Sequence, residues 1–343
     1  MLMGRAINDQ FKKDLMEGCL KELLEEVKND NTLIMELRGS SVIIYYRGGA
    51  LFTITSTESG DYKISYNSAY WGIKKKYSEL VDNPTVDECV KYIALYKHQM
   101  DYHRANAARE LEKQGQQRLI LENNILGGKN SKDASEKTQI PTGDYFIIDM
   151  EYAYKNKGID ARFDAIGLKW PSLPTVRKNG KGLGISFIEL KYYDNAMDDT
   201  SGIEKHISDF VKFTTDEMYK EDYYKMCKDM TEVFRQKCEL GLIPSYTSRL
   251  DMTQERYLNI SIDPAKAEMI FIFVNRDPDS SVAARELDKC LRKYSLDKMK
   301  NIYVATSSDM GYVMFRYADK GKKDRYITIQ KYAEDYGYEY DNE

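Results

Sequence analysis

Residues 267–274 constrain the fold most, because they form a run that is apolar at every position except Glu268. Strands with one solvated face alternate apolar and polar residues, whereas a continuous apolar strand is typical of burial on both faces. A strand buried in this way needs a covering layer on each side of its sheet, and helices supply such layers in α/β proteins. The run therefore predicts a sheet flanked by helices.

The elements expected before this run follow the order helix, three strands, helix, and the run itself adds a strand. Helical spacing of apolar residues predicts the helices, and short apolar runs predict the strands. The expected ranges are a helix over 99–124, strands over 145–152, 161–168 and 185–191, and a helix over 201–239. This order predicts a mixed sheet flanked by helices, and so an α/β (α+β) fold.

The first part of the chain has a different pattern. An amphipathic helix is expected over residues 8–29, and four short strands are expected between residues 32 and 66. These elements predict a small antiparallel sheet with one helix, in an N-terminal domain spanning residues 1–97 to which no role is assigned. Residues 98–343 then form the larger domain.

Composition excludes several classes of protein. The formal net charge is −4, so a globally basic nucleic-acid binder is excluded and any phosphate backbone must meet a local basic patch. The five cysteines form no CxxC pair, which argues against a zinc site or a disulfide framework and favours free thiols in a reducing cytoplasm. No signal peptide and no apolar stretch approaching the roughly 20 residues of a membrane helix is found, so a cytoplasmic protein without a membrane partner is expected.

The strand expected over residues 185–191 ends in the charged tripeptide Glu189-Leu190-Lys191. Side chains alternate along a strand, so Glu189 and Lys191 should share one face, roughly 7 Å apart. If the strand over residues 161–168 forms a hairpin with this one, Asp164 lies beside Glu189. Two neighbouring carboxylates repel each other unless a proton or a cation lies between them. A hard divalent cation, which prefers oxygen ligands, would resolve that conflict.

Phe163-Asp164 and Glu189-Leu190-Lys191 resemble the two acidic motifs of the PD-(D/E)xK, or restriction-endonuclease-like, nuclease superfamily. The order of elements over residues 99–275 is similar to the core of that superfamily. Phe163 stands where the motif name has proline, and no glutamine–tyrosine motif is found on the following helix. The resemblance implies that Asp164 and Glu189 ligate Mg²⁺ or Mn²⁺, and that Lys191 orients or polarises the attacking water.

Glu151, on the strand before, is the further metal ligand expected. Asp149 shares its strand face and stays an alternative. An exposed acidic stripe explains both residues equally well.

Basic residues near these motifs suggest contacts to phosphate. Four lie between the two strands of the expected hairpin, and two lie at the start of the next helix, where anions bind favourably. The candidate nucleic-acid-binding residues are Lys169, Arg177, Lys178, Lys181, Lys205 and His206. A solvated turn and a capping or surface histidine are the alternatives.

The expected function is that of a metal-dependent nuclease hydrolysing DNA, with RNA as substrate and a homodimer left open. The resemblance alone implies a role in bacterial defence, repair or mobile-element biology. The alternative is a catalytically inactive nuclease-fold module that binds nucleic acid or a protein partner.

Overall fold

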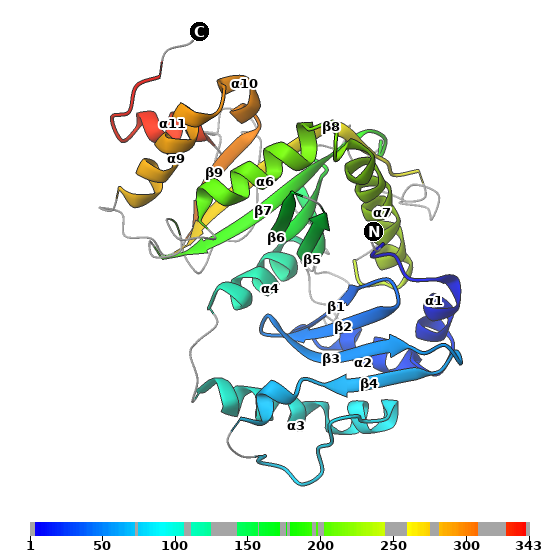
Figure 1. Cartoon of the computed structure of the whole chain (residues 1–343). Helices are drawn as coiled ribbons and strands as arrows, with labels where there is room; N and C mark the ends of the chain where they lie inside the picture. The colour runs from blue at the N-terminus through cyan, green and yellow to red at the C-terminus, as the bar shows by residue number, and fades with distance from the viewer. Residues whose placement is uncertain are drawn as a thin grey trace, which may run out of the picture. The chain divides into compact units, whose positions relative to one another are not determined.

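The computed structural model describes residues 4–72, 75–105, 111–124, 143–156, 158–171, 176, 179–193, 197, 202–243, 259–274, 281–307 and 327–340. Contacts within the chain divide it into two compact units (Figure 1). The N-terminal unit comprises residues 3–121 and 232–245, and the C-terminal unit comprises the rest. Residues 98–121 thus group with the N-terminal unit rather than with the larger one.

The N-terminal unit contains a four-stranded antiparallel sheet in the order β1-β2-β3-β4. The β2–β3 hairpin turns at Arg47 and Gly48, whose φ angles of 49° and 75° match the type I′ turn that suits strand twist. The strands are β1 (Leu33–Leu37), β2 (Ser41–Tyr46), β3 (Gly49–Ser56) and β4 (Tyr62–Tyr66).

Helices accompany this sheet in the N-terminal part of the sequence. The helix expected over residues 8–29 is two helices, because the Gly18 N–H bonds back to Lys13 and Asp14 and closes the first. The elements are α1 (Asp9–Met16), α2 (Lys21–Asn29), the 3₁₀ turn η1 (Ser68–Trp71), α3 (Val86–Ala105) and α4 (Leu111–Asn124).

The C-terminal unit contains a six-stranded mixed sheet in the order β10-β9-β8-β7-β6-β5. The neighbours β5, β6 and β7 form an antiparallel meander, whereas β8 and β9 run parallel to β7. The strands are β5 (Tyr145–Asn156), β6 (Ile159–Lys169), β7 (Leu183–Tyr192), β8 (Ile262–Val274), β9 (Ile302–Ser307) and β10 (Ile327–Thr328). The mixed α/β fold expected from the sequence is confirmed.

The apolar run on β8 is buried from Glu268 to Val274, and every residue of β7 is buried. The helices around this sheet are α6 (Ile203–Thr215), α7 (Lys220–Glu239), α9 (Val282–Lys293), α10 (Leu296–Met299) and α11 (Ile329–Glu334). The single helix expected over 201–239 is wrong: it breaks after Thr215, where the Asp216 side chain accepts a hydrogen bond from the Met218 N–H at 2.9 Å.

Helix α6 covers one face of the central strands. The Phe187 ring on β7 lies 5.4 Å from Phe210 and 6.3 Å from Phe213 of α6, between ring centroids.

Within the part of the chain that is described, no helix has both the length and the apolar character of a membrane-crossing segment.

A buried ion pair joins β1 to the end of α7 within the N-terminal unit. Lys237 Nζ lies 2.7 Å from Glu36 Oε1, and the two residues are 2% and 1% exposed. Arg38 lies farther from Glu36, at 3.7 Å. Removing one partner of a buried pair leaves a charge without its counter-charge, which is strongly destabilising.

We expect Lys237→Met to lower the free energy of unfolding by about 3 kcal/mol, because Glu36 then stays buried without its nearest cation. Lys220→Met is the matched control, since Lys220 forms an exposed pair with Glu217 and its loss should change the stability much less. Urea unfolding of both variants measures the difference, and equal losses would contradict the structural role of the pair.

Asp30 provides a pH-dependent contact. Burial opposes ionisation of Asp30, but hydrogen bonds from Lys97 and Thr32 outweigh it and hold the pKa of its carboxyl below the usual value. Ionised Asp30 therefore stabilises the fold above its ordinary pKa of about 4, and this contribution is lost as pH falls through the lowered value. The free energy of unfolding should be higher for wild type than for Asp30→Asn. This difference should be largest at about pH 6 and should shrink as the pH falls below about 4. A gap in urea unfolding that is constant over this pH range would count against the assignment.

Candidate functional site

Glu189 and Lys191 lie near the end of β7, on the face that α6 covers. Because β7 pairs regularly with β8 through Tyr192, alternate residues share a face, and Phe187, Glu189 and Lys191 all point toward α6. Lys191 Nζ lies 2.9 Å from Glu189 Oε1. The structure therefore brings together the two charged residues of the tripeptide, as the alternation predicted.

A third side chain, His206 of α6, completes this group. Its Nε2 lies 2.9 Å from Glu189 Oε1, and its Nδ1 lies 3.1 Å from the Arg162 carbonyl oxygen on β6. Its Nε2 also lies 3.3 Å from Lys191 Nζ, so the three side chains contact one another. Glu189, Lys191 and His206 are 3%, 3% and 6% exposed. The group is a buried network of charge-assisted hydrogen bonds between sheet and helix.

The charge state of Glu189 follows from this environment. Burial alone would raise the pKa of its carboxyl, since desolvation disfavours the charged form. The hydrogen bond and charge of His206, with those of Lys191, outweigh burial and hold the Glu189 pKa below its usual value. Glu189 is therefore a carboxylate near neutral pH.

The second oxygen of this carboxylate is different. Glu189 Oε2 is buried and accepts no hydrogen bond from any described part of the chain. A buried oxygen without a partner is unusual and costs free energy comparable to a lost hydrogen bond. In an ionised carboxylate it also offers a hard, negatively charged ligand atom.

Asp164 of β6 approaches the same stretch of β7. Regular pairing of the two strands runs from Lys169–Gly184 to Ala165–Ile188 and stops there. Beyond that point the Leu190 N–H donates to Asp164 Oδ2 at 2.7 Å, so a side chain replaces the missing ladder partner. The Asp164 carboxylate is half-buried and lies against the peptide that follows Glu189.

The backbone of β5 and β6 is irregular around Asp164. Phe187 pairs with Ile166, yet its ring lies 4.8 Å from that of Phe163, so the alternation of faces on β6 is interrupted between residues 163 and 166. Beside Asp164 on β5, Glu151 adopts a φ of 55°, a left-handed conformation that non-glycine residues adopt infrequently. The position of the Asp164 carboxylate therefore cannot be derived from strict alternation along β6. Its hydrogen bond from the Leu190 N–H shows that it lies beside the end of β7.

The remaining acidic candidates are close in sequence but differ in environment. Glu151 is exposed, whereas Asp149 is buried and pairs with Ile166. Among the described residues, no three aspartate, glutamate, histidine or cysteine side chains gather closely enough to hold a metal ion. The expected set of Asp164, Glu189 and Glu151 is thus adjacent along three strands without forming a three-ligand cluster.

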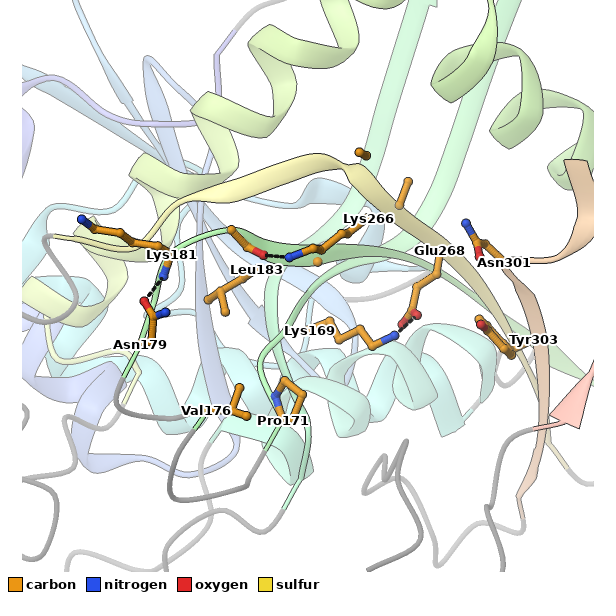
Figure 2. A pocket seen from close by; sticks show the side chains of 14 residues that line it. Lys169, Pro171, Val176, Asn179, Lys181, Leu183, Lys266, Glu268, Asn301 and Tyr303 are labelled. Atoms are coloured by element: carbon orange, nitrogen blue, oxygen red, sulfur yellow. Dashed lines mark hydrogen bonds and ion pairs between the residues drawn. The ribbon is translucent and has the colours of Figure 1, made fainter. Parts of the chain in front are cut away.

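The candidate nucleic-acid-binding residues do not share one place. Lys169 pairs with Gly184, five strand positions and roughly 17 Å from Asp164, and both Lys169 and Lys181 line a cavity at that far end of the hairpin (Figure 2). This separation follows from antiparallel pairing, which puts the connecting loop at the opposite end from Asp164. Arg177 and Lys178 lie outside the described residues.

Lys205 and His206 both start α6 but have separate partners. Lys205 donates to the Asp160 carbonyl oxygen at 2.8 Å and to Asp209, whereas His206 bonds Glu189. His206 is thus neither an exposed nor a capping residue. The sequence carried a signal for this burial, because His206 stands four positions before Phe210 and shares its apolar face.

A double substitution can separate the network from ordinary packing. We expect Lys191→Met to lower the free energy of unfolding by about 3 kcal/mol, because it removes a counter-charge of buried Glu189. The double variant Glu189→Gln/Lys191→Met should be more stable than Lys191→Met alone, because no uncompensated carboxylate is left. Guanidinium unfolding curves test this order, and a double variant that loses the sum of both single effects would refute it.

No protein-family model, curated protein or solved structure matches this chain. The side chains around Glu189 therefore carry the information about function. They include an ionised carboxylate with one oxygen that has no hydrogen-bond partner among the described residues, an adjacent ammonium, and a second carboxylate on the neighbouring strand.

Proposed function

We propose that this protein is a metal-dependent nuclease that hydrolyses DNA, with Asp164, Glu189 and Lys191 at its centre. The observation that carries the proposal is the buried Glu189 Oε2, which has no hydrogen-bond partner among the described residues although its carboxylate is ionised. A divalent cation would satisfy that oxygen. Together with the sequence resemblance, this favours phosphodiester hydrolysis over other chemistry of an acidic pair.

The donor set fits Mg²⁺ or Mn²⁺ in kind, because carboxylate oxygens are the ligands that hard cations prefer. Asp164 and Glu189 would hold the ion, and Glu151, exposed on the next strand, is the candidate for a third protein ligand. Such an ion, when bound, supplies positive charge that stabilises the charge developing on the scissile phosphate.

The residues of the chain have separate roles in this proposal. His206 and Lys191 keep Glu189 ionised, and the Leu190 N–H fixes one oxygen of Asp164. Lys191 carries a permanent ammonium beside Glu189, with its Nζ 2.9 Å from Oε1. Its ammonium is therefore the group best placed to orient a water or a phosphate oxygen beside the carboxylates.

A second candidate function is an inactive nuclease-fold module that binds nucleic acid or a protein partner. Two observations favour it. Lys191 and His206 already neutralise Glu189 Oε1 within a group that is at most 6% exposed, and the described residues include no three-ligand metal cluster. In this alternative the three residues form a structural network that no longer has a catalytic role.

Nuclease activity tests the first proposal. Purified protein with Mn²⁺ should cut plasmid and linear DNA, EDTA should stop it, and the same assay on RNA defines the substrate. Asp164→Asn, Glu189→Gln and Lys191→Met should each reduce the rate at least about hundredfold, because each removes a group acting on the developing charge. Asp160→Asn is the matched control on the same strand. Asp160 forms ion pairs with Lys155 and Arg162 rather than with the Glu189 group, so this variant should keep full activity.

Titration with Mn²⁺ by calorimetry separates the two candidates. A nuclease should give binding heat that Asp164→Asn abolishes while Asp160→Asn retains it. Protein that is folded by circular dichroism but shows neither Mn²⁺ heat nor cleavage supports the inactive module. Cleavage that persists unchanged in all three site variants would exclude this centre altogether.

A further inference from the structure

The C-terminal unit contains a cavity of about 670 Å³ at the end of the sheet where β7 begins (Figure 2). Its lining comes from the end of β6, the segment leading into β7, β8 and the region where β9 starts. Cavities of 300–1,000 Å³ are typical of small-ligand sites. The space is therefore sufficient for one small molecule and too small for a nucleic-acid duplex.

This cavity is separate from the Glu189 group. Lys169, Gly184, Ser186 and Glu268 share one face of the sheet, because Lys169 pairs with Gly184 and Ser186 pairs with Glu268. Phe187 and Glu189 lie on the other face, toward α6. From Gly184 to Glu189 the strand rises about 17 Å. A ligand in the cavity cannot touch the metal-site residues.

Glu268, at the inner end of the cavity, is buried and fully bonded. Its Oε1 accepts from the Tyr145 hydroxyl at 2.7 Å and the Ser186 hydroxyl at 2.9 Å, and its Oε2 accepts from Lys169. The carboxylate and the Lys169 ammonium cancel each other's charge. Glu268 is thus a structural anchor, and a bound cation would find both of its oxygens in use.

The other two lysines of the lining, Lys181 and Lys266, have different surroundings. Lys266 donates to the Gly182 carbonyl oxygen at 2.6 Å and has a carboxylate, Asp263, only at 3.7 Å, where both are well exposed. Lys181 stands at the rim with its ammonium extending away from the Lys169–Glu268 pair in Figure 2, and no described carboxylate pairs with it. Lys181 therefore adds one positive charge at the rim that no described carboxylate balances, and this excess favours an anionic ligand.

The rest of the lining defines the body of that ligand. Pro171, Val176 and Leu183 provide an apolar wall, while Asn301 and Tyr303 on the other side offer an amide and a phenol ring. A ligand with a flat apolar part and a charged phosphate part matches this division. The lining is thus about equally polar and apolar, which suits a ligand with one polar and one apolar part.

We propose that this cavity binds a free mononucleotide, with its phosphates toward Lys181 and Lys266 and its base against Pro171, Val176 and Leu183. The site is independent of the nuclease proposal, since it shares no residue with the Glu189 group. The 5′-phosphorylated end of a nucleic-acid strand carries the same chemistry, so the test must distinguish these two sources.

Calorimetric titration with AMP and ATP in EDTA tests the proposal, because the chelator removes any contribution from a metal at Glu189. Wild type should bind at least one of the two nucleotides. Lys181→Gln and Lys266→Gln should each weaken binding about tenfold, the value of one lost charge-assisted hydrogen bond. Lys300→Gln is the matched control, because Lys300 is an exposed lysine paired with Asp297 outside the cavity lining, and it should bind as wild type does.

Three results would overturn the inference. The first is the absence of AMP and ATP binding to wild-type protein. The second is equal affinity in the cavity variants and the Lys300→Gln control, with circular dichroism showing that all are folded. The third is binding of a 5′-phosphorylated hexanucleotide, but not of its unphosphorylated form or of either nucleotide, which would assign the cavity to strand ends.

Discussion

Strand β7 is hydrogen-bonded on both edges and buried along its whole length. This burial determines which hydrogen-bond partners the polar groups on and beside the strand can have. Water cannot solvate Ser186, Glu189 or Lys191, so each must find partners on neighbouring elements. Glu189 finds them in Lys191 and His206 on the α6 face, and Ser186 finds Glu268 on the opposite face. Two polar groups thus arise on opposite faces of one strand, at Ser186 and Glu189.

The two groups differ in how completely their carboxylates are satisfied. Both oxygens of Glu268 accept hydrogen bonds, which explains its role as an anchor. Glu189 accepts hydrogen bonds at Oε1 while Oε2 has no described partner. A buried ion pair contributes little net stability, because desolvation opposes the Coulomb attraction. Glu189 combines an oxygen that has no described partner with a second carboxylate, Asp164, beside it on the neighbouring strand. This combination supports the proposal of a cation site there.

Several features could be predicted from the sequence because they depend on local periodicity. The apolar run on β8 implied burial on both faces, and alternation along β7 put Glu189 beside Lys191. Other features depend on contacts between distant segments. Asp164 is located by its bond to the Leu190 N–H at a point where strand pairing stops, and Lys169 is separated from it by the direction of the hairpin. His206 could have been recognised as buried, but its partner Glu189 could not.

The sequence by itself determined the mixed α/β architecture and the face that Glu189 and Lys191 share, because hydrophobic burial imposes a period of two on strands and of 3.6 on helices. Only the tertiary structure decided where α6 places His206, which Glu189 oxygen is left without a described partner, and that Lys169 and Lys181 line a cavity on the other face. Those outcomes depend on strand register and helix packing, in which a shift of one residue exchanges the two faces of a strand.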